Sequence, residues 1–102
     1  MSAYLIVRAK VEESSCQIFD KWYEEEHLPD ALREFKALSA KRGWSEVEPN
    51  THLAFYEFEN LTTANKLLES GIMKAFIKKF DHQWEGKVTR TRELLEIKQF
   101  LK

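Results

Sequence analysis

Residues 3–11 alternate between two faces in the way typical of a β-strand. Leu5 and Val7 fall on one face of this segment. Tyr4 and Ile6 fall on the other. Because this first half of the strand is apolar on both faces, we expect both of its sides to be covered.

Helical spacing follows the first strand. Ser14 and Gln17 form a capping-box signature at its start. The spacing predicts a helix that ends near His27, because Pro29 disfavours the helical conformation of the residue before it. Pro29 is itself suited to the first turn of a helix, so we expect a second, short helix over residues 30–35.

The rest of the chain predicts three strands and one long, interrupted helix. Asn60 is suited to the N-cap of this helix. Gly71 is expected to interrupt it as a cap or a kink. Gly43 marks a position for a bulge in the second strand. The expected elements are a strand over 37–47, a strand over 51–59, a helix over 61–83 and a last strand within 88–100.

The elements follow one another in the order β-α-β-β-α-β. This order is that of the ferredoxin-like α+β fold, an antiparallel four-stranded sheet with two helices on one face. No repeat, linker or low-complexity tract divides the chain, so residues 1–102 are expected to form a single domain. No helix is left to cover the other face of the sheet, and an exposed apolar patch of that kind usually marks an interaction site. The apolar residues expected there are Tyr4, Ile6, Leu53 and Phe55.

Charge and cysteine content argue against several classes of protein. Lys and Arg total 16 and Asp and Glu total 17, and the resulting net charge of −1 argues against nucleic-acid binding. The single cysteine, Cys16, can form no internal disulfide, and with three scattered histidines we expect no metal site. The apolar run over residues 4–7 is too short for a signal peptide or a membrane span. We expect a cytoplasmic protein with neither a membrane nor a nucleic-acid partner.

An RNA-recognition domain has the same order of elements and is an alternative within this fold. The strand over 51–58 matches its aromatic motif only in part. Thr51 stands where the motif needs a basic residue, His52 where it needs glycine, and Leu53 where it needs a stacking ring. The near-zero net charge also counts against RNA binding.

One stretch of the chain is similar to a known group of proteins. The run W-Y-E-E-E-H-L-P-D over residues 22–30, with Arg42 in the next strand, resembles the dimeric α+β barrel superfamily, and most closely EthD-like and related small bacterial domains. Residues 53–57 and 92–97 resemble its third and last strands. The family often has a glycine turn after the proline, whereas residues 33–36 contain no glycine.

The resemblance implies a homodimer whose two sheets pack face to face, with a cleft between sheet and helices in each subunit. Members of the superfamily include cofactor-independent monooxygenases, polyketide cyclases, lactone isomerases and haem-degrading enzymes. Many have no known activity. The fold therefore does not select a reaction.

His27 is the first candidate for a catalytic residue, because it titrates near neutral pH and stands where the first helix is expected to end. Trp22 and Glu26 lie one helical turn apart, so both can face the same cleft as its wall and as a second acid or base. Each also has a purely structural interpretation. His27 can cap the helix end, Trp22 can belong to the core, and Glu26 can lie on the surface.

Other residues complete the hypothetical binding site. Tyr56 is a candidate wall of the cleft, while Arg42, Arg90 and Arg92 on strands can bind an anionic substrate or pair with the abundant glutamates. Arg42 and Arg92 are the arginines we assign to the substrate. The chain is then predicted to bind or transform a small aromatic or carbonyl-bearing molecule by acid–base chemistry, with no organic cofactor. The alternative is a non-catalytic dimeric binding or interaction module, which explains the apolar sheet face equally well and needs nothing from His27.

Overall fold

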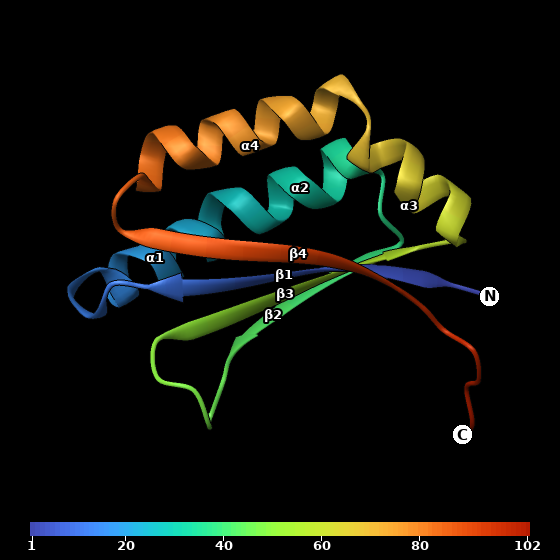
Figure 1. Cartoon of the computed structure of the whole chain (residues 1–102), viewed down its shortest axis with the longest axis horizontal. Helices are drawn as coiled ribbons and strands as arrows, with labels where there is room; N and C mark the ends of the chain where they lie inside the picture. The colour runs from blue at the N-terminus through green and yellow to red at the C-terminus, as the bar shows by residue number, and fades with distance from the viewer.

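Four antiparallel strands form a single sheet in the computed structural model, which describes residues 1–102. The sheet order is β2-β3-β1-β4 (Figure 1). This is the sheet of the ferredoxin-like α+β fold, so the predicted fold class is confirmed. The strands are β1 (Ala3–Val11), β2 (Ser39–Trp44), β3 (Thr51–Phe58) and β4 (Val88–Glu96).

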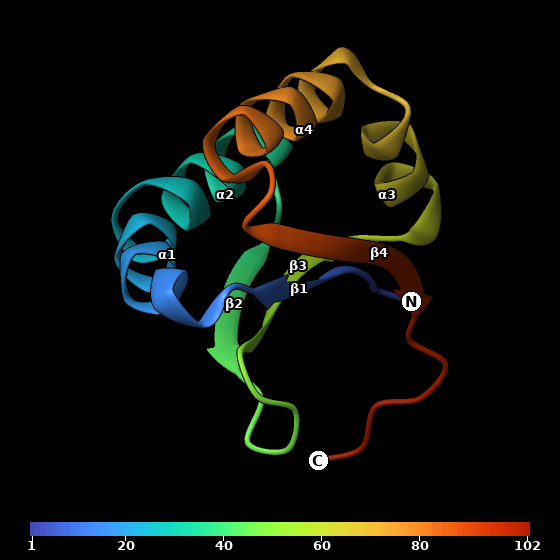
Figure 2. The ribbon, with the colours of Figure 1, turned by 60° about the vertical axis from the view of Figure 1, so that its left-hand side comes forward.

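The helices lie together on one face of the sheet (Figure 2). The first helical segment is continuous and consists of a 3₁₀ turn, η1 (Glu13–Ser15), then α1 (Cys16–Trp22), a π-helical turn, η2 (Tyr23–His27), and α2 (Leu28–Phe35). The second consists of α3 (Leu61–Leu68) and α4 (Gly71–Trp84). The expected interruption near Gly71 is confirmed, and the Asn60 and Ser70 side chains cap α3 and α4 by accepting backbone N–H groups.

Three local predictions are wrong. The predicted helix end before Pro29 is absent, because Leu28 keeps helical angles of φ −65° and ψ −46°. Ser15 stands at the N-cap of α1 without a side-chain cap bond, so the Ser14 capping box is absent. Gly43 pairs in register with Leu53 and forms no bulge.

The π-helical turn explains how the chain continues through Pro29. Proline lacks an N–H, and inside a helix its ring clashes with the carbonyl four residues earlier. In the widened turn, the Leu28 N–H reaches back to the Tyr23 carbonyl, five residues away. The wider spacing relieves the crowding before the proline, and the helix passes into α2 without breaking.

The widened turn also keeps one face of the helix against the sheet. The buried residues of the helix from α1 to α2 are each four apart: Phe19, Tyr23, His27, Ala31 and Phe35. In a regular α-helix, positions four apart drift by about 40° around the axis at each step. A π-helical turn, with more residues per turn, takes up part of this drift. Tyr23 and His27 therefore both point toward the sheet.

The other face of the sheet carries no helix (Figures 1 and 2). Ile6 and Phe55 are direct cross-strand neighbours near its middle, flanked by Tyr4 and Leu53, and all four are only half-buried. The chain beyond Glu96 extends away on this side. No helix combines the length and the apolar character needed to cross a membrane.

Candidate functional site

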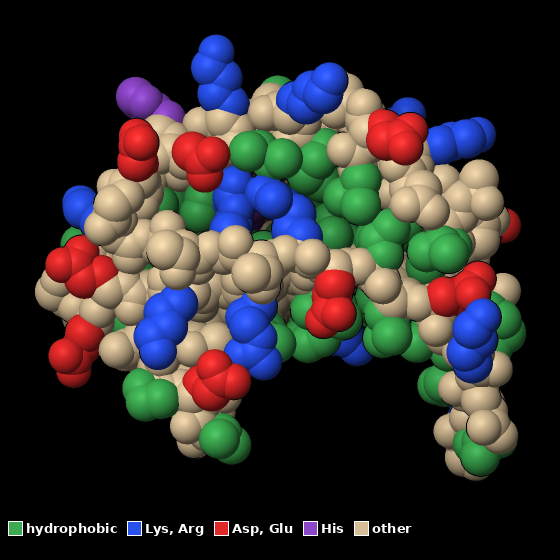
Figure 3. All heavy atoms as spheres, in the orientation of Figure 1, with side chains coloured by type: hydrophobic (Ala, Val, Ile, Leu, Met, Phe, Trp, Pro, Cys, Tyr) green, Lys and Arg blue, Asp and Glu red, His purple; other side chains and the backbone are tan.

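A small cavity lies between the helices and the sheet. Its volume is about 30 Å³, room for one or two water molecules. Nine of its 12 lining residues are hydrophobic, and the others are His27, Arg90 and Arg92. Figure 3 shows the surface hollowed between α4 and β4, with basic side chains among hydrophobic ones. The cleft is therefore an apolar space with a few convergent polar groups, the usual composition of a small-molecule site.

His27 is a buried imidazole without a hydrogen-bond partner in the protein. It is 9% exposed and lies among aromatic rings. Trp22 stacks on it with 4.6 Å between ring centroids, and Tyr23 meets it edge-on at 4.7 Å. Burial, aided by the positive charges of Arg90 and Lys79, lowers the pKa of His27 to about 3. The imidazole is therefore neutral at pH 7, and one of its ring nitrogens carries a free lone pair.

Two tyrosine hydroxyls lie together in the cavity wall. The oxygens of Tyr23 and Tyr56 are 3.0 Å apart, and both side chains are almost completely buried. In such a pair one hydroxyl donates to the other, and the acceptor keeps a proton of its own. No other protein group accepts that proton. Burial raises the pKa of Tyr23 to about 12 and also raises the pKa of Tyr56, so both remain protonated donors.

The structure brings some of the predicted site residues together and leaves others apart. His27, Tyr56 and Arg92 line the cavity. Trp22 stacks on the His27 ring but does not line the cavity itself. Glu26 is exposed and does not line the cavity. The reason is that the buried face of the helix passes through His27, and a neighbouring residue points about 100° away from it.

Tyr23 was not among the predicted site residues. The sequence did indicate that Tyr23 lies near His27, since the two residues are four apart and so share one face of the helix. An aromatic ring at this spacing is more often a simple core residue. Only the pairing of its hydroxyl with that of Tyr56, from β3, gives Tyr23 a second role.

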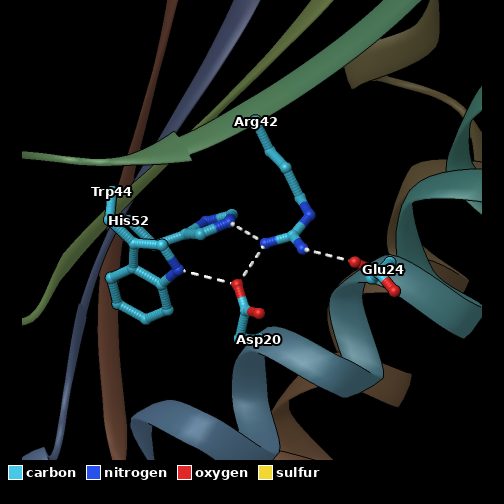
Figure 4. A network of polar contacts seen from close by, with 5 residues as sticks. All are labelled: Asp20, Glu24, Arg42, Trp44 and His52. Atoms are coloured by element: carbon cyan, nitrogen blue, oxygen red, sulfur yellow. Dashed lines mark hydrogen bonds and ion pairs between the residues drawn. The ribbon is translucent and has the colours of Figure 1, made fainter.

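Arg42 belongs to a separate polar network that joins the first helix to the sheet (Figure 4). Asp20 accepts hydrogen bonds from Arg42 at 2.8 Å and from the Trp44 indole at 2.7 Å. Arg42 also lies 3.8 Å from Glu24 and donates to Nε2 of His52 at 3.2 Å. Since a guanidinium cannot accept, His52 is neutral with its proton on Nδ1. Arg42 thus pairs with acidic side chains and does not line the cavity.

We predict that this network stabilises the fold. Replacing Asp20 with alanine leaves the half-buried Arg42 side chain with one distant acid and the Trp44 N–H without its acceptor. The expected loss is about 2 kcal/mol in the free energy of unfolding, measured by urea denaturation at pH 7. Glu25→Ala, which removes an exposed acid from the same helical segment, is the control and should change stability by less than about 0.5 kcal/mol. Equal stability of the two variants would show that the network is not a stabilising contact.

No protein-family profile and no curated protein matches the chain. Solved structures do match. An ethyl tert-butyl ether d (EthD) family protein from Bacillus halodurans superposes with a TM-score of 0.69 at 16% identity, over 91% of this chain and 97% of that one. SnoaB, a cofactor-independent oxygenase from Streptomyces nogalater, gives 0.67 at 10% identity over 98% and 96%. A protein from Deinococcus radiodurans, provisionally described as an antibiotic biosynthesis monooxygenase, gives 0.72 at 12% identity over 98% and 96%.

At such low identities these likenesses show the fold alone. They place an EthD family protein and monooxygenase-like proteins of the dimeric α+β barrel type among the structural neighbours of this chain. The resemblance that the motif around His27 implied is thus confirmed at the level of fold. Any activity has to be argued from the cleft itself.

Proposed function

We propose that the protein binds a small aromatic or carbonyl-bearing molecule in the cleft and moves a proton on it without an organic cofactor. One observation carries this proposal: His27 is a buried, neutral imidazole with no hydrogen-bond partner, in the wall of an apolar cavity. A histidine that only capped a helix would bond backbone carbonyls, and His27 does not. A neutral imidazole keeps a free lone pair, and negative charge developing on a bound substrate raises its pKa toward the range of a general base.

In the proposed reaction His27 removes a proton from the carbon beside a carbonyl group, or from a phenolic hydroxyl. Negative charge develops on the substrate oxygen, and the free O–H of the Tyr23–Tyr56 pair donates to it. The imidazolium then returns the proton to another atom of the same molecule, so the step needs neither an oxidant nor a reductant. Trp22 is a positioning residue, because its stacked ring holds the imidazole in place.

The bound ligand needs more room than the present cavity offers, since small-molecule sites usually measure 300 Å³ or more. We propose that side chains of α4 move aside when the ligand enters. Met73, Phe76 and Ile77 form that wall of the cavity. Met73 is the most adaptable of them, because its unbranched side chain repacks easily.

The proposal includes a cytoplasmic homodimer in which the uncovered faces of two sheets pack together. Tyr4, Ile6, Leu53 and Phe55 form the centre of this face. Leu95, on β4, extends it and is 47% exposed. A specific interface buries about 1,600 Å² in total, and an uncovered four-stranded sheet with an apolar centre suits packing of this kind.

We predict that the protein catalyses deuterium incorporation from D₂O at the α-carbon of aryl ketones, followed by NMR. Tyr56→Phe should slow this exchange at least tenfold, because the variant breaks the hydroxyl pair that donates to the developing oxyanion. Tyr4→Phe removes the hydroxyl of a tyrosine on the opposite face of the sheet and should leave the rate unchanged.

Two results would contradict the proposed chemistry. An unchanged rate in Tyr56→Phe would remove the tyrosine pair from the mechanism. Binding of the ketones in the cleft without any exchange above background would favour the non-catalytic binding module instead.

A further inference from the structure

Arg92 is the only arginine of the chain without an acidic partner. It makes no ion pair or hydrogen bond with the protein, although it lines the cavity that also contains His27. Arg92 is exposed to solvent, and an exposed arginine without a protein partner is available to an anion that enters the cavity from outside. The other four pair as follows: Arg8 with Glu48, Arg33 with Asp30 and Glu34, Arg42 with Asp20 and Glu24, and Arg90 with Asp81.

Arg90 adds a second positive charge at the same place. The two residues are two apart on β4, so their side chains lie on the same face of the sheet. The Arg90 side chain is only 10% exposed, and its guanidinium carbon lies 3.7 Å from the centroid of the Phe80 ring. Asp81 accepts from it at 3.2 Å but is 61% exposed, so water weakens this pairing. The protein therefore compensates the positive charge of the two arginines only in part.

We infer that the ligand of the cleft is an organic carboxylate whose carboxylate group binds Arg92, with Arg90 beside it. A guanidinium presents two parallel N–H donors that match the two oxygens of a carboxylate. The uncharged part of the molecule then lies against the apolar wall formed by Val7, Phe76 and Ile77, and points toward His27. This inference rests on the proposed function, and it narrows the substrate to acids with an aromatic or carbonyl group near the carboxylate.

The test compares acids with their own primary amides. Phenylpyruvate, phenylacetate and 4-hydroxybenzoate, each paired with its amide, are titrated into the full chain, and dissociation constants are measured from amide shifts in ¹⁵N–¹H NMR spectra. At least one acid is expected to bind tenfold or more tightly than its amide, with shifts around His27. Arg92→Gln should reduce this preference to twofold or less, and Arg92→Lys should keep part of it. Arg33→Gln removes the same charge from the exposed side of α2 and should leave the preference intact.

The possible failures are distinguishable. If acids and amides bind the cleft equally well, the carboxylate inference is wrong and the proposed pocket stands. If the preference survives in Arg92→Gln, the anion binds elsewhere, and the inference is also wrong. If no acid or amide shifts the resonances of the cavity residues at millimolar concentration, both the inference and the proposed function fail.

Discussion

Replacing Phe55 with aspartate is expected to convert the protein from a homodimer to a folded monomer. Light scattering at micromolar concentration should give twice the 12.1 kDa chain mass for the unaltered protein and 12.1 kDa for the variant. Phe55 stands opposite Ile6 on β1 and Lys41 on β2, in the middle of the uncovered sheet face. A carboxylate there would lose its water on association, and pairing with Lys41 would desolvate the lysine as well, a cost of several kcal/mol.

The monomer should remain folded because Phe55 lies outside the core. The buried side chains of β3 are its neighbours in the alternation, Ala54 and Tyr56, which face the helices. Circular dichroism of Phe55→Asp should therefore match that of the parent chain. Ile18→Asp is the matched control, since Ile18 is an exposed apolar residue of α1, and α1 lies on the helix-covered face. Persistence of the dimer in Phe55→Asp, or a monomeric parent chain, would contradict the proposed interface.

Strands were the elements most faithfully predicted from the sequence. The first strand was predicted over 3–11 and occurs there, because alternation of apolar residues identifies both its extent and its core-facing side. The second was predicted over 37–47 and is shorter, Ser39–Trp44. Its alternation is weak, so only pairing with β3 defines its ends.

The local sequence pattern did not predict that the first helical segment continues through Pro29. A rule about the residue before proline is statistical, and the π-helical turn at Tyr23–His27 gives the chain another way to accommodate Pro29. The sequence did contain a sign of it, since Phe19, Tyr23, His27, Ala31 and Phe35 recur every four positions.

The sequence likewise identified some residues of the candidate site correctly and not others. His27, Tyr56 and Arg92 could be named because each has a side chain whose chemistry suits a cleft, and the structure places all three around one cavity. Arg42 could not be separated from them by sequence, because an arginine on a strand can meet either a ligand or an acid. Which acid lies near Arg42 depends on how α1 packs on β2. The sequence does not show this packing, and only the structure identifies Asp20 as the partner.

Replacing His27 with phenylalanine is expected to abolish the exchange activity and to make the fold less sensitive to acid. The phenyl ring keeps the aromatic contacts with Trp22 and Phe76, and the adjacent cavity has room for its larger volume, so the fold should be retained. It has no nitrogen to accept a proton. Deuterium incorporation into the aryl ketones should therefore fall at least a hundredfold, close to the background rate.

The effect on stability follows from the lowered pKa of His27. The imidazole has a pKa of about 3 in the folded protein, against 6.5 when exposed, so the unfolded chain binds the proton first as the pH falls. Stability then decreases from about pH 6.5 downward, and at pH 5 this histidine costs the fold about 2 kcal/mol relative to pH 7. His27→Phe removes that cost. His52, whose pKa burial lowers to about 4, keeps a similar dependence in both proteins.

Urea denaturation at pH 7 and pH 5 measures the difference. Between these two values, His27→Phe should lose about 2 kcal/mol less stability than the parent chain. His82→Phe alters an exposed histidine of α4 and should follow the parent chain in both stability and exchange rate.

An identical pH dependence in His27→Phe and the parent would mean that His27 is not buried in its neutral form. Retained exchange in His27→Phe would mean that another group removes the proton. Loss of exchange together with increased relative stability in acid is the combination expected only of a buried catalytic base, because a purely structural histidine would change stability alone.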